Sequence, residues 1–237
     1  MSQPDNMANS TWPGAIIWDL DGTLIDSAPD LATALNTVLN DQGLNSLTIP
    51  QVRTMIGAGV AKLIERAFRG SRVKLDAAGV EALMPGFMEI YSNCATDTTT
   101  VSPATRRVLN YFYKAGVLQG LCTNKPEAVT RKILHALDMH CFFSSVIGGD
   151  STAQRKPHPL PLQTVMEQLG VTPDECIMVG DSGADVGAAR AAGVPVALVP
   201  DGYTGVPVES LGADFVLNGL STLPAEINSF RPVQKSA

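Results

Sequence analysis

The chain has 237 residues, of which 45% are hydrophobic and 17% are charged, so it can bury a sizeable core. Its formal net charge of −6 argues against a nucleic-acid-binding protein, because such proteins present a basic face to phosphates. It has no apolar run near the roughly 20 residues of a membrane span, and four scattered cysteines without a CxxC pair indicate reduced thiols in a cytoplasmic protein.

Both ends of the chain are polar. The first residues, MSQPDNMANSTWP, have neither the basic start nor the apolar stretch of a secretory signal peptide. Their Gln, Asn, Ser and Pro content predicts a flexible extension over 1–13. The last seven residues, RPVQKSA, predict a frayed tail.

Short apolar runs alternate with helical patterns along most of the chain. This alternation predicts an α/β protein with a doubly wound, Rossmann-like parallel sheet covered on both faces. The expected strands are 15–20, 118–124, 144–150, 176–181, 195–200 and 213–217.

The first two expected strands are separated by far more sequence than one crossover needs. Helical patterns occur within this interval at 29–42, 49–68, 77–95 and 103–116. We therefore expect a helical cap over 30–99, inserted into a core made of 14–29 and 100–230.

Two aspartates follow the first apolar run. Asp19 and Asp21 come directly after Ala15–Trp18 and before the turn residues Gly22 and Thr23. Alternate strand residues share a face, so the two carboxylates would crowd one another and either share a proton or bind a cation. The carboxyl ends of strands are where open α/β sheets bind ligands.

Further polar residues follow the later strands and would meet at the same edge. Thr123 and Asn124 end the second strand, Asp181 and Asp185 follow the fourth, and Lys156 precedes a helix. Carboxylates suit a hard cation, whereas Thr and Lys donate hydrogen bonds to phosphate oxygens. This combination predicts Mg²⁺ together with a phosphoryl group.

These motifs resemble, in order, the four motifs of the haloacid dehalogenase superfamily: DLDGT at 19–23, Thr123, KPHP at 156–159 and GDSGAD at 180–185. The helical insertion resembles that superfamily's type-1 cap. LIDSAPDL at 24–31 and GAGVAKLIERAF at 57–68 most resemble the bacterial phosphoglycolate phosphatase branch.

The resemblance implies a Mg²⁺-dependent phosphomonoester phosphatase that forms an aspartyl-phosphate and hydrolyses 2-phosphoglycolate. Asp19 would be the nucleophile and Asp21 the general acid and base. Asp19, Asp181 and the Asp21 backbone carbonyl would hold Mg²⁺, with Asp185 in support. The phosphoryl group would contact Gly22, Thr123, Asn124 and Lys156. A small phosphorylated metabolite is the expected partner, with no nucleic acid or membrane, for a monomer or homodimer.

The cap carries a local basic face, with Lys62, Arg66 and Arg69 at helical spacing and Arg53 upstream. One interpretation is a solvated surface. The alternative is that Arg53 or Lys62 binds the substrate's carboxylate. The helical spacing of Met84, Phe87, Ile90 and Tyr91 predicts cap core.

Two alternatives remain open at this point. A sugar-phosphate phosphatase or a phosphomutase would share the architecture, although Thr23 resembles the phosphatase pattern more than the valine-like residue of mutases. A phospho-accepting receiver module uses similar groups, but its acceptor should end a third strand and its chain should be about half as long.

Overall fold

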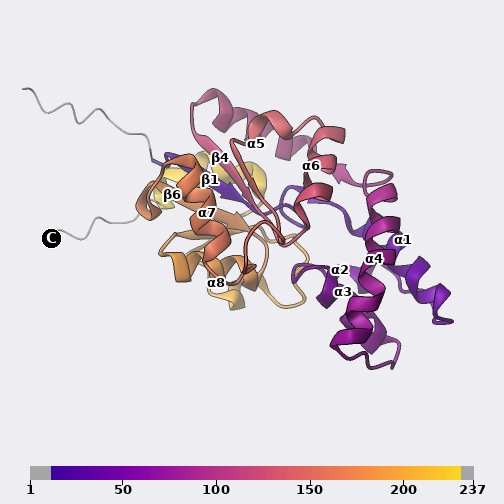
Figure 1. Cartoon of the computed structure of the whole chain (residues 1–237). Helices are drawn as coiled ribbons and strands as arrows, with labels where there is room; N and C mark the ends of the chain where they lie inside the picture. Colours follow the sequence, from indigo (N-terminus) through magenta and orange to yellow (C-terminus); the bar gives the residue numbers. More distant parts are fainter. Residues whose placement is uncertain (1–11, 231–237) are drawn as a thin grey trace, which may run out of the picture.

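The computed structural model describes residues 12–230 (Figure 1). The expected N-terminal extension lies outside the described residues except for Trp12 and Pro13, and the expected C-terminal tail lies wholly outside them. The Trp12 indole N–H donates a hydrogen bond to the Asp174 carbonyl at 3.0 Å. This contact ties the start of the described chain to the core.

Six parallel strands form the central sheet, in the order β5-β4-β1-β6-β7-β8. The strand order reverses at the first strand, which has the second main strand on one side and the fourth on the other. The predicted doubly wound α/β core is therefore confirmed. The strands are β1 (Ala15–Trp18), β4 (Leu118–Cys122), β5 (Ser145–Ile147), β6 (Cys176–Gly180), β7 (Val196–Leu198) and β8 (Phe215–Val216).

Helices cover both faces of this sheet, as the apolar character of β1 requires (Figure 1). Ile16 and Trp18 point into one hydrophobic cluster, and Ala15 and Ile17 point into the other. The first face is covered by α5 (Pro103–Lys114), α6 (Glu127–Ala136) and α9 (Leu223–Glu226), and the second by α7 (Leu160–Leu169) and α8 (Gly183–Ala192). Short 3-10 turns lie at His140–Phe142, Pro173–Glu175, Val208–Leu211, Leu220–Thr222 and Ile227–Phe230.

The inserted segment folds into four helices that pack on one another beside the core (Figure 1). The helix expected over 49–68 is instead two helices, so that prediction is wrong in one respect. Gly57 and Gly59 have φ values of 103° and 85°, which an α-helix does not accommodate, and the chain turns there. The helices are α1 (Ala28–Asp41), α2 (Ile49–Arg53), α3 (Val60–Gly70) and α4 (Ala77–Cys94).

The chain crosses between core and cap twice, and the two crossings lie side by side. β2 (Ile25–Asp26) and β3 (Thr100–Val101) form a short antiparallel ribbon. The buried Asp30 carboxylate accepts hydrogen bonds from the backbone N–H of Thr98 at 2.9 Å and of Thr99 at 2.8 Å. This ribbon was not predicted, because its pairing joins residues far apart in the chain.

Within residues 12–230, no helix combines the length and the apolar character needed to cross a bilayer. All four cysteines lie in this part of the chain, and each is a free thiol. The expectation that they form no disulfide framework agrees with this arrangement.

Candidate active site

The candidate site lies at the carboxyl edge of the sheet, where the strand order reverses. Asp19 and Asp21 follow β1, while Thr123 follows the neighbouring β4 and Asp181 follows β6 on the other side. All four side chains are buried. Since parallel strands end at one edge, residues up to 162 positions apart in sequence meet in one place.

Lys156 is held between two of the carboxylates. Its Nζ lies 2.9 Å from Asp19 Oδ1 and 2.7 Å from Asp185 Oδ1, and it donates to the Cys122 carbonyl at 2.5 Å. Burial alone would lower the pKa of Lys156, but Asp185 and Asp19 outweigh burial and raise it, so the ammonium stays charged. These three partners use all three N–H bonds, so a phosphate oxygen would have to replace one of them.

Three carboxylates crowd at this point with one ammonium between them. Asp19, Asp181 and Asp185 each offer an oxygen within 4.8 Å of the others. Burial raises the pKa of Asp19 from 3.8 to about 6, with Lys156 opposing and Asp185 adding to the effect. Burial, and then Asp19 and Asp185, raise the pKa of Asp181 well above its ordinary range. Ionising all three carboxylates beside a single lysine is therefore unfavourable unless a further cation is present.

Asp185 is already saturated with donors. Besides Lys156, it accepts hydrogen bonds from the backbone N–H groups of Asp181 at 3.2 Å and Ser182 at 3.0 Å, and from the Ser182 hydroxyl at 2.7 Å. It caps the start of α8 and orients the turn that carries Asp181. Asp185 thus contacts both Asp181 and Lys156, and its supporting role in the reaction stays a prediction.

Gly22 lies against Asp181. Its φ is +84°, and a Cβ there would be 2.3 Å from Asp181 Oδ2, so only glycine leaves room for this carboxylate. The same oxygen accepts the Tyr203 backbone N–H at 2.6 Å. The Gly22 amide donates to the Ile25 carbonyl at 3.0 Å. Our expectation that this amide binds phosphate is therefore not met in this structure.

A small cavity of about 30 Å³ separates Asp19 and Asp21 from the cap. Thr123 lies in its wall, and the Thr123 hydroxyl accepts the backbone N–H of Lys125 at 3.2 Å, which leaves the hydroxyl proton for a ligand. The core contributes Asp19, Asp21, Thr123, Asn124, Lys125 and Pro126, and the cap contributes Leu31, Ile56, Gly57, Gly59, Val60, Leu63 and Tyr91.

Asn124 joins the cap loop to the core at this cavity. Its amide nitrogen donates to the Gly57 carbonyl at 2.9 Å and to the Lys156 carbonyl at 3.0 Å. Both side-chain N–H bonds are thus used, so a phosphate contact of Asn124 would have to come from its backbone N–H and stays a prediction. The amide of Asn124 instead connects three parts of the site.

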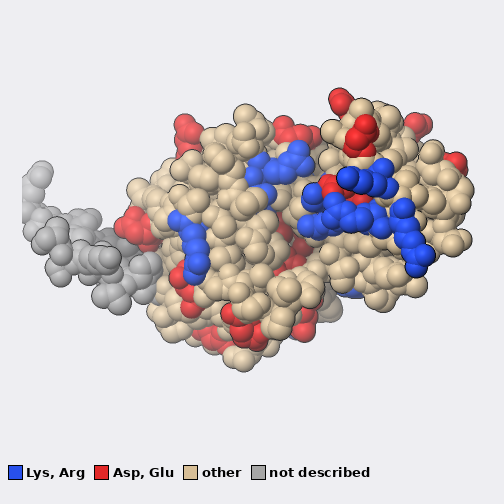
Figure 2. All heavy atoms as spheres, turned by 90° about the horizontal axis from the view of Figure 1, so that it is seen from below, with Lys and Arg blue, Asp and Glu red and all other residues tan. Residues whose placement is uncertain are grey.

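Arg53 and Lys62, the two cap residues that we considered as alternatives for binding the substrate's carboxylate, do not line this cavity. Arg53 pairs with the Asp26 carboxylate and lies over the Tyr203 ring, 5.2 Å from its centroid. Lys62 is 45% exposed and pairs with Glu65 at 2.6 Å. Several Lys and Arg side chains gather on the outer surface of the cap (Figure 2). Each of these two cations already has a nearby carboxylate, so the structure does not bring either one to the candidate site.

Sequence reasoning missed Lys125, which contacts Asp21. Its Nζ donates to Asp21 Oδ1 at 2.9 Å and to the Tyr91 hydroxyl at 2.6 Å. Tyr91 is buried and stacks on Phe87, as expected of cap core, yet its hydroxyl also reaches the site. The available signal was the position of Lys125, directly after Thr123 and Asn124.

Known proteins are similar along most of the chain. A family model described as haloacid dehalogenase-like hydrolase matches residues 16–199. A phosphoglycolate phosphatase of Rhodospirillum rubrum is 40% identical over 215 residues, 89% of each chain, and one of Xylella fastidiosa is 38% identical over 199 residues, 84% of this chain and 85% of the relative. The crystal structure of a predicted phosphoglycolate phosphatase from Haemophilus somnus superposes with a TM-score of 0.83 at 29% identity, covering 90% of this chain and 97% of that one.

Proposed function

Because this chain belongs to the haloacid dehalogenase-like hydrolase family and is a phosphatase of that family, we propose that it hydrolyses 2-phosphoglycolate to glycolate and inorganic phosphate. The observation that carries the proposal is the meeting of Asp19, Asp21 and Thr123 in one cavity covered by the cap. Family membership also removes the receiver-module alternative.

The proposed reaction has two steps that use the same two aspartates. An Asp19 carboxylate oxygen attacks phosphorus, and the P–O ester bond breaks as the Asp21 carboxyl group gives its proton to the leaving oxygen. The Asp21 carboxylate then takes a proton from water, whose oxygen attacks phosphorus. Inorganic phosphate leaves, and Asp19 is again a carboxylate while Asp21 is again protonated. Lys156 holds Asp19 in place at 2.9 Å, and the Thr123 hydroxyl is a donor for a phosphoryl oxygen.

The acidic cluster fits a divalent cation. The three buried carboxylates repel one another and have one ammonium between them. This repulsion contributes to the raised pKa values of Asp19 and Asp181. Asp19 and Asp181 retain free lone pairs, whereas Asp185 has none to spare, so the first two would hold Mg²⁺ together with the Asp21 backbone carbonyl. Bound Mg²⁺ would neutralise charge on the phosphoryl oxygens.

The cavity favours a small substrate over a sugar phosphate. About 30 Å³ accommodates only two or three water molecules, which suits a small ester better than a hexose phosphate. The cap side of the cavity is formed by apolar side chains, by the backbone of Gly57 and Gly59, and by Tyr91, whose hydroxyl is already bonded to Lys125. Few groups there could therefore bind the hydroxyls of a sugar ring. The curated relatives at 38–40% identity are named phosphoglycolate phosphatases, which supports the same substrate.

A panel of phosphate esters with Mg²⁺ tests this proposal. We expect kcat/KM to be highest for 2-phosphoglycolate, lower for ethyl phosphate, and lowest for a hexose phosphate, with inorganic phosphate released in every case. Radiolabelled substrate should transiently label Asp19, and Asp19→Asn should give no label and no turnover. A preference for the hexose phosphate would refute the substrate, and label on Ser182 or His158 would refute the mechanism.

A further inference from the structure

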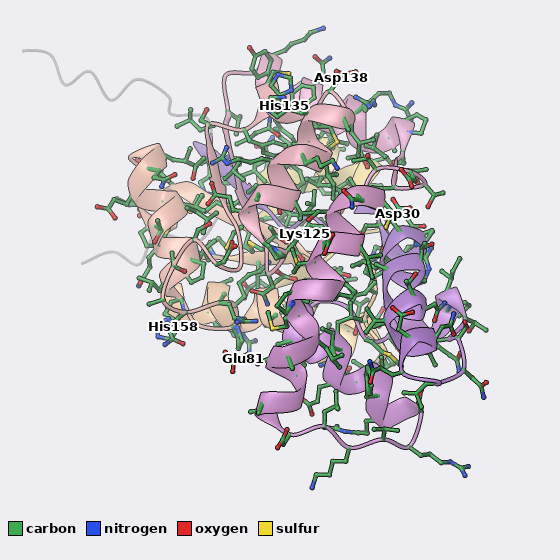
Figure 3. The ribbon with its side chains drawn as sticks, turned by 45° about the vertical axis from the view of Figure 1, so that its right-hand side comes forward. Asp30, Glu81, Lys125, His135, Asp138 and His158 are labelled. Atoms are coloured by element: carbon green, nitrogen blue, oxygen red, sulfur yellow. The ribbon has the colours of Figure 1, made fainter. Side chains whose placement is uncertain are left out.

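Lys125 is a buried cation to which the proposed reaction gives no role. Its side chain is 3% exposed and lies where the core meets the cap helix α4 (Figure 3). Taking an ammonium group out of water is costly unless the group is paired and hydrogen-bonded. Its partners must therefore account for its position.

Those partners come from the two different parts of the molecule. Lys125 Nζ donates to Asp21 Oδ1 at 2.9 Å in the core and to the Tyr91 hydroxyl at 2.6 Å in the cap. The ammonium also lies 4.9 Å from the centroid of the Tyr91 ring. Since Tyr91 belongs to α4, this half of the contact exists only while the cap covers the site. Lys125 thus links the position of the cap helix α4 to the Asp21 carboxyl group in the core.

The contacts also set the rotation of that carboxyl group. Ser27 Oγ and Lys125 Nζ both donate hydrogen bonds to Asp21 Oδ1. In the described part of the chain, every hydrogen bond to the Asp21 side chain ends on this oxygen. The second oxygen is left for the substrate, because Asp21 lies in the cavity wall. Because both donors hold Asp21 Oδ1, the other oxygen of Asp21 is the one that exchanges a proton with the substrate.

We propose that Lys125 and Tyr91 are positioning residues that hold Asp21 in its proton-donating orientation only while the cap covers the site. The inference rests on the proposed function, in which the Asp21 proton passes to the ester oxygen and the electrons of the broken P–O bond stay on that oxygen. Chemistry would then wait until the cap excludes bulk water.

Leaving groups of graded acidity test this role. The quantity kcat/KM covers only the steps up to release of the alcohol, so it reports the first proton transfer and not the later attack of water. An alkyl phosphate needs that proton, whereas p-nitrophenyl phosphate releases a stable phenolate without it. We would measure kcat/KM for 2-phosphoglycolate, ethyl phosphate and p-nitrophenyl phosphate in Tyr91→Phe and Lys125→Met.

Tyr91→Phe keeps the ring and removes one hydroxyl, so the variant should fold even if Lys125→Met does not. We expect kcat/KM for both alkyl phosphates to fall about tenfold in Tyr91→Phe and about a hundredfold in Lys125→Met, since misplacing a catalytic group costs about that much. The value for p-nitrophenyl phosphate should stay within about threefold. Lys132→Met is the matched control, because Lys132 reaches the Ser92 carbonyl on α4 without touching Asp21, and it should leave all three values unchanged.

Three outcomes would overturn the inference. If Tyr91→Phe lowered kcat/KM equally for all three esters, Tyr91 would have only a structural role. If kcat/KM did not change, Tyr91 would have no role in the reaction. A loss confined to 2-phosphoglycolate would mean that Lys125 binds the substrate's carboxylate instead. Asp21→Asn separates this inference from the proposed function: if it does not lower alkyl phosphate hydrolysis selectively, the acid role of Asp21 itself is wrong. Ethyl phosphate still decides the inference if 2-phosphoglycolate is not a substrate.

Discussion

Replacing Asp19 by asparagine should stabilise the metal-free protein while abolishing turnover. Burial raises the pKa of Asp19 from 3.8 to about 6. Ionising this side chain at neutral pH therefore costs free energy in the folded protein. An asparagine has nearly the same shape and carries no charge. Lys156 would lose one partner and keep Asp185 and the Cys122 carbonyl.

The expected magnitude follows from the pKa difference. Raising the pKa of a carboxyl from 3.8 to about 6 removes about 3 kcal/mol from the free energy of unfolding once the group is ionised. The sign is fixed, because between these two values the unfolded chain has released the proton and the folded chain still holds it. The wild type should therefore lose stability relative to Asp19→Asn as the pH rises from about 4 to 6, with no further change above about 7.

Thermal unfolding in excess chelator measures this difference. At pH 7.5 the Tm of Asp19→Asn should exceed that of the wild type by roughly 6–12 °C, and the two should converge near pH 4. Adding Mg²⁺ should raise the Tm of the wild type more than that of the variant. A variant that is less stable than the wild type at pH 7.5, or a difference independent of pH, would refute the reasoning.

Two further predictions concern the metal and its neighbouring glycine. Excess chelator should abolish turnover, and full activity in chelator would contradict the metal requirement. Asp181→Asn should raise the Mg²⁺ concentration for half-maximal activity by about tenfold or more, since a neutral amide oxygen replaces an anionic carboxylate ligand. Gly22→Ala should lower both Tm and Mg²⁺ affinity, because its Cβ would lie 2.3 Å from Asp181 Oδ2. Gly43→Ala is the control, with φ +71° and nothing within 4 Å; equal effects would show backbone strain alone.

Local sequence was sufficient to predict much of the core. An apolar strand followed by Asp19, Asp21 and Gly22 combines a buried run with turn residues, and both signals come from adjacent positions. Parallel strands end at one edge of a sheet, so the strand assignment alone predicted that Thr123 and Asp181 would meet the first two aspartates. The order of strands and polar residues in the sequence is thus enough to predict the edge of the sheet at which the candidate site lies.

The partners of charged side chains were decided only by tertiary structure. Arg53 was one candidate for the substrate's carboxylate, yet β2 brings Asp26 beside it and the ion pair forms there. Lys125 was overlooked because Tyr91, 34 residues earlier, reaches it only when α4 packs over the cavity. A long cationic side chain can reach several acceptors, and its choice depends on which element approaches it and how much water is excluded. The spacing of residues in the sequence shows neither which element approaches nor how much water is excluded. The cap's contribution to the site therefore follows from packing alone.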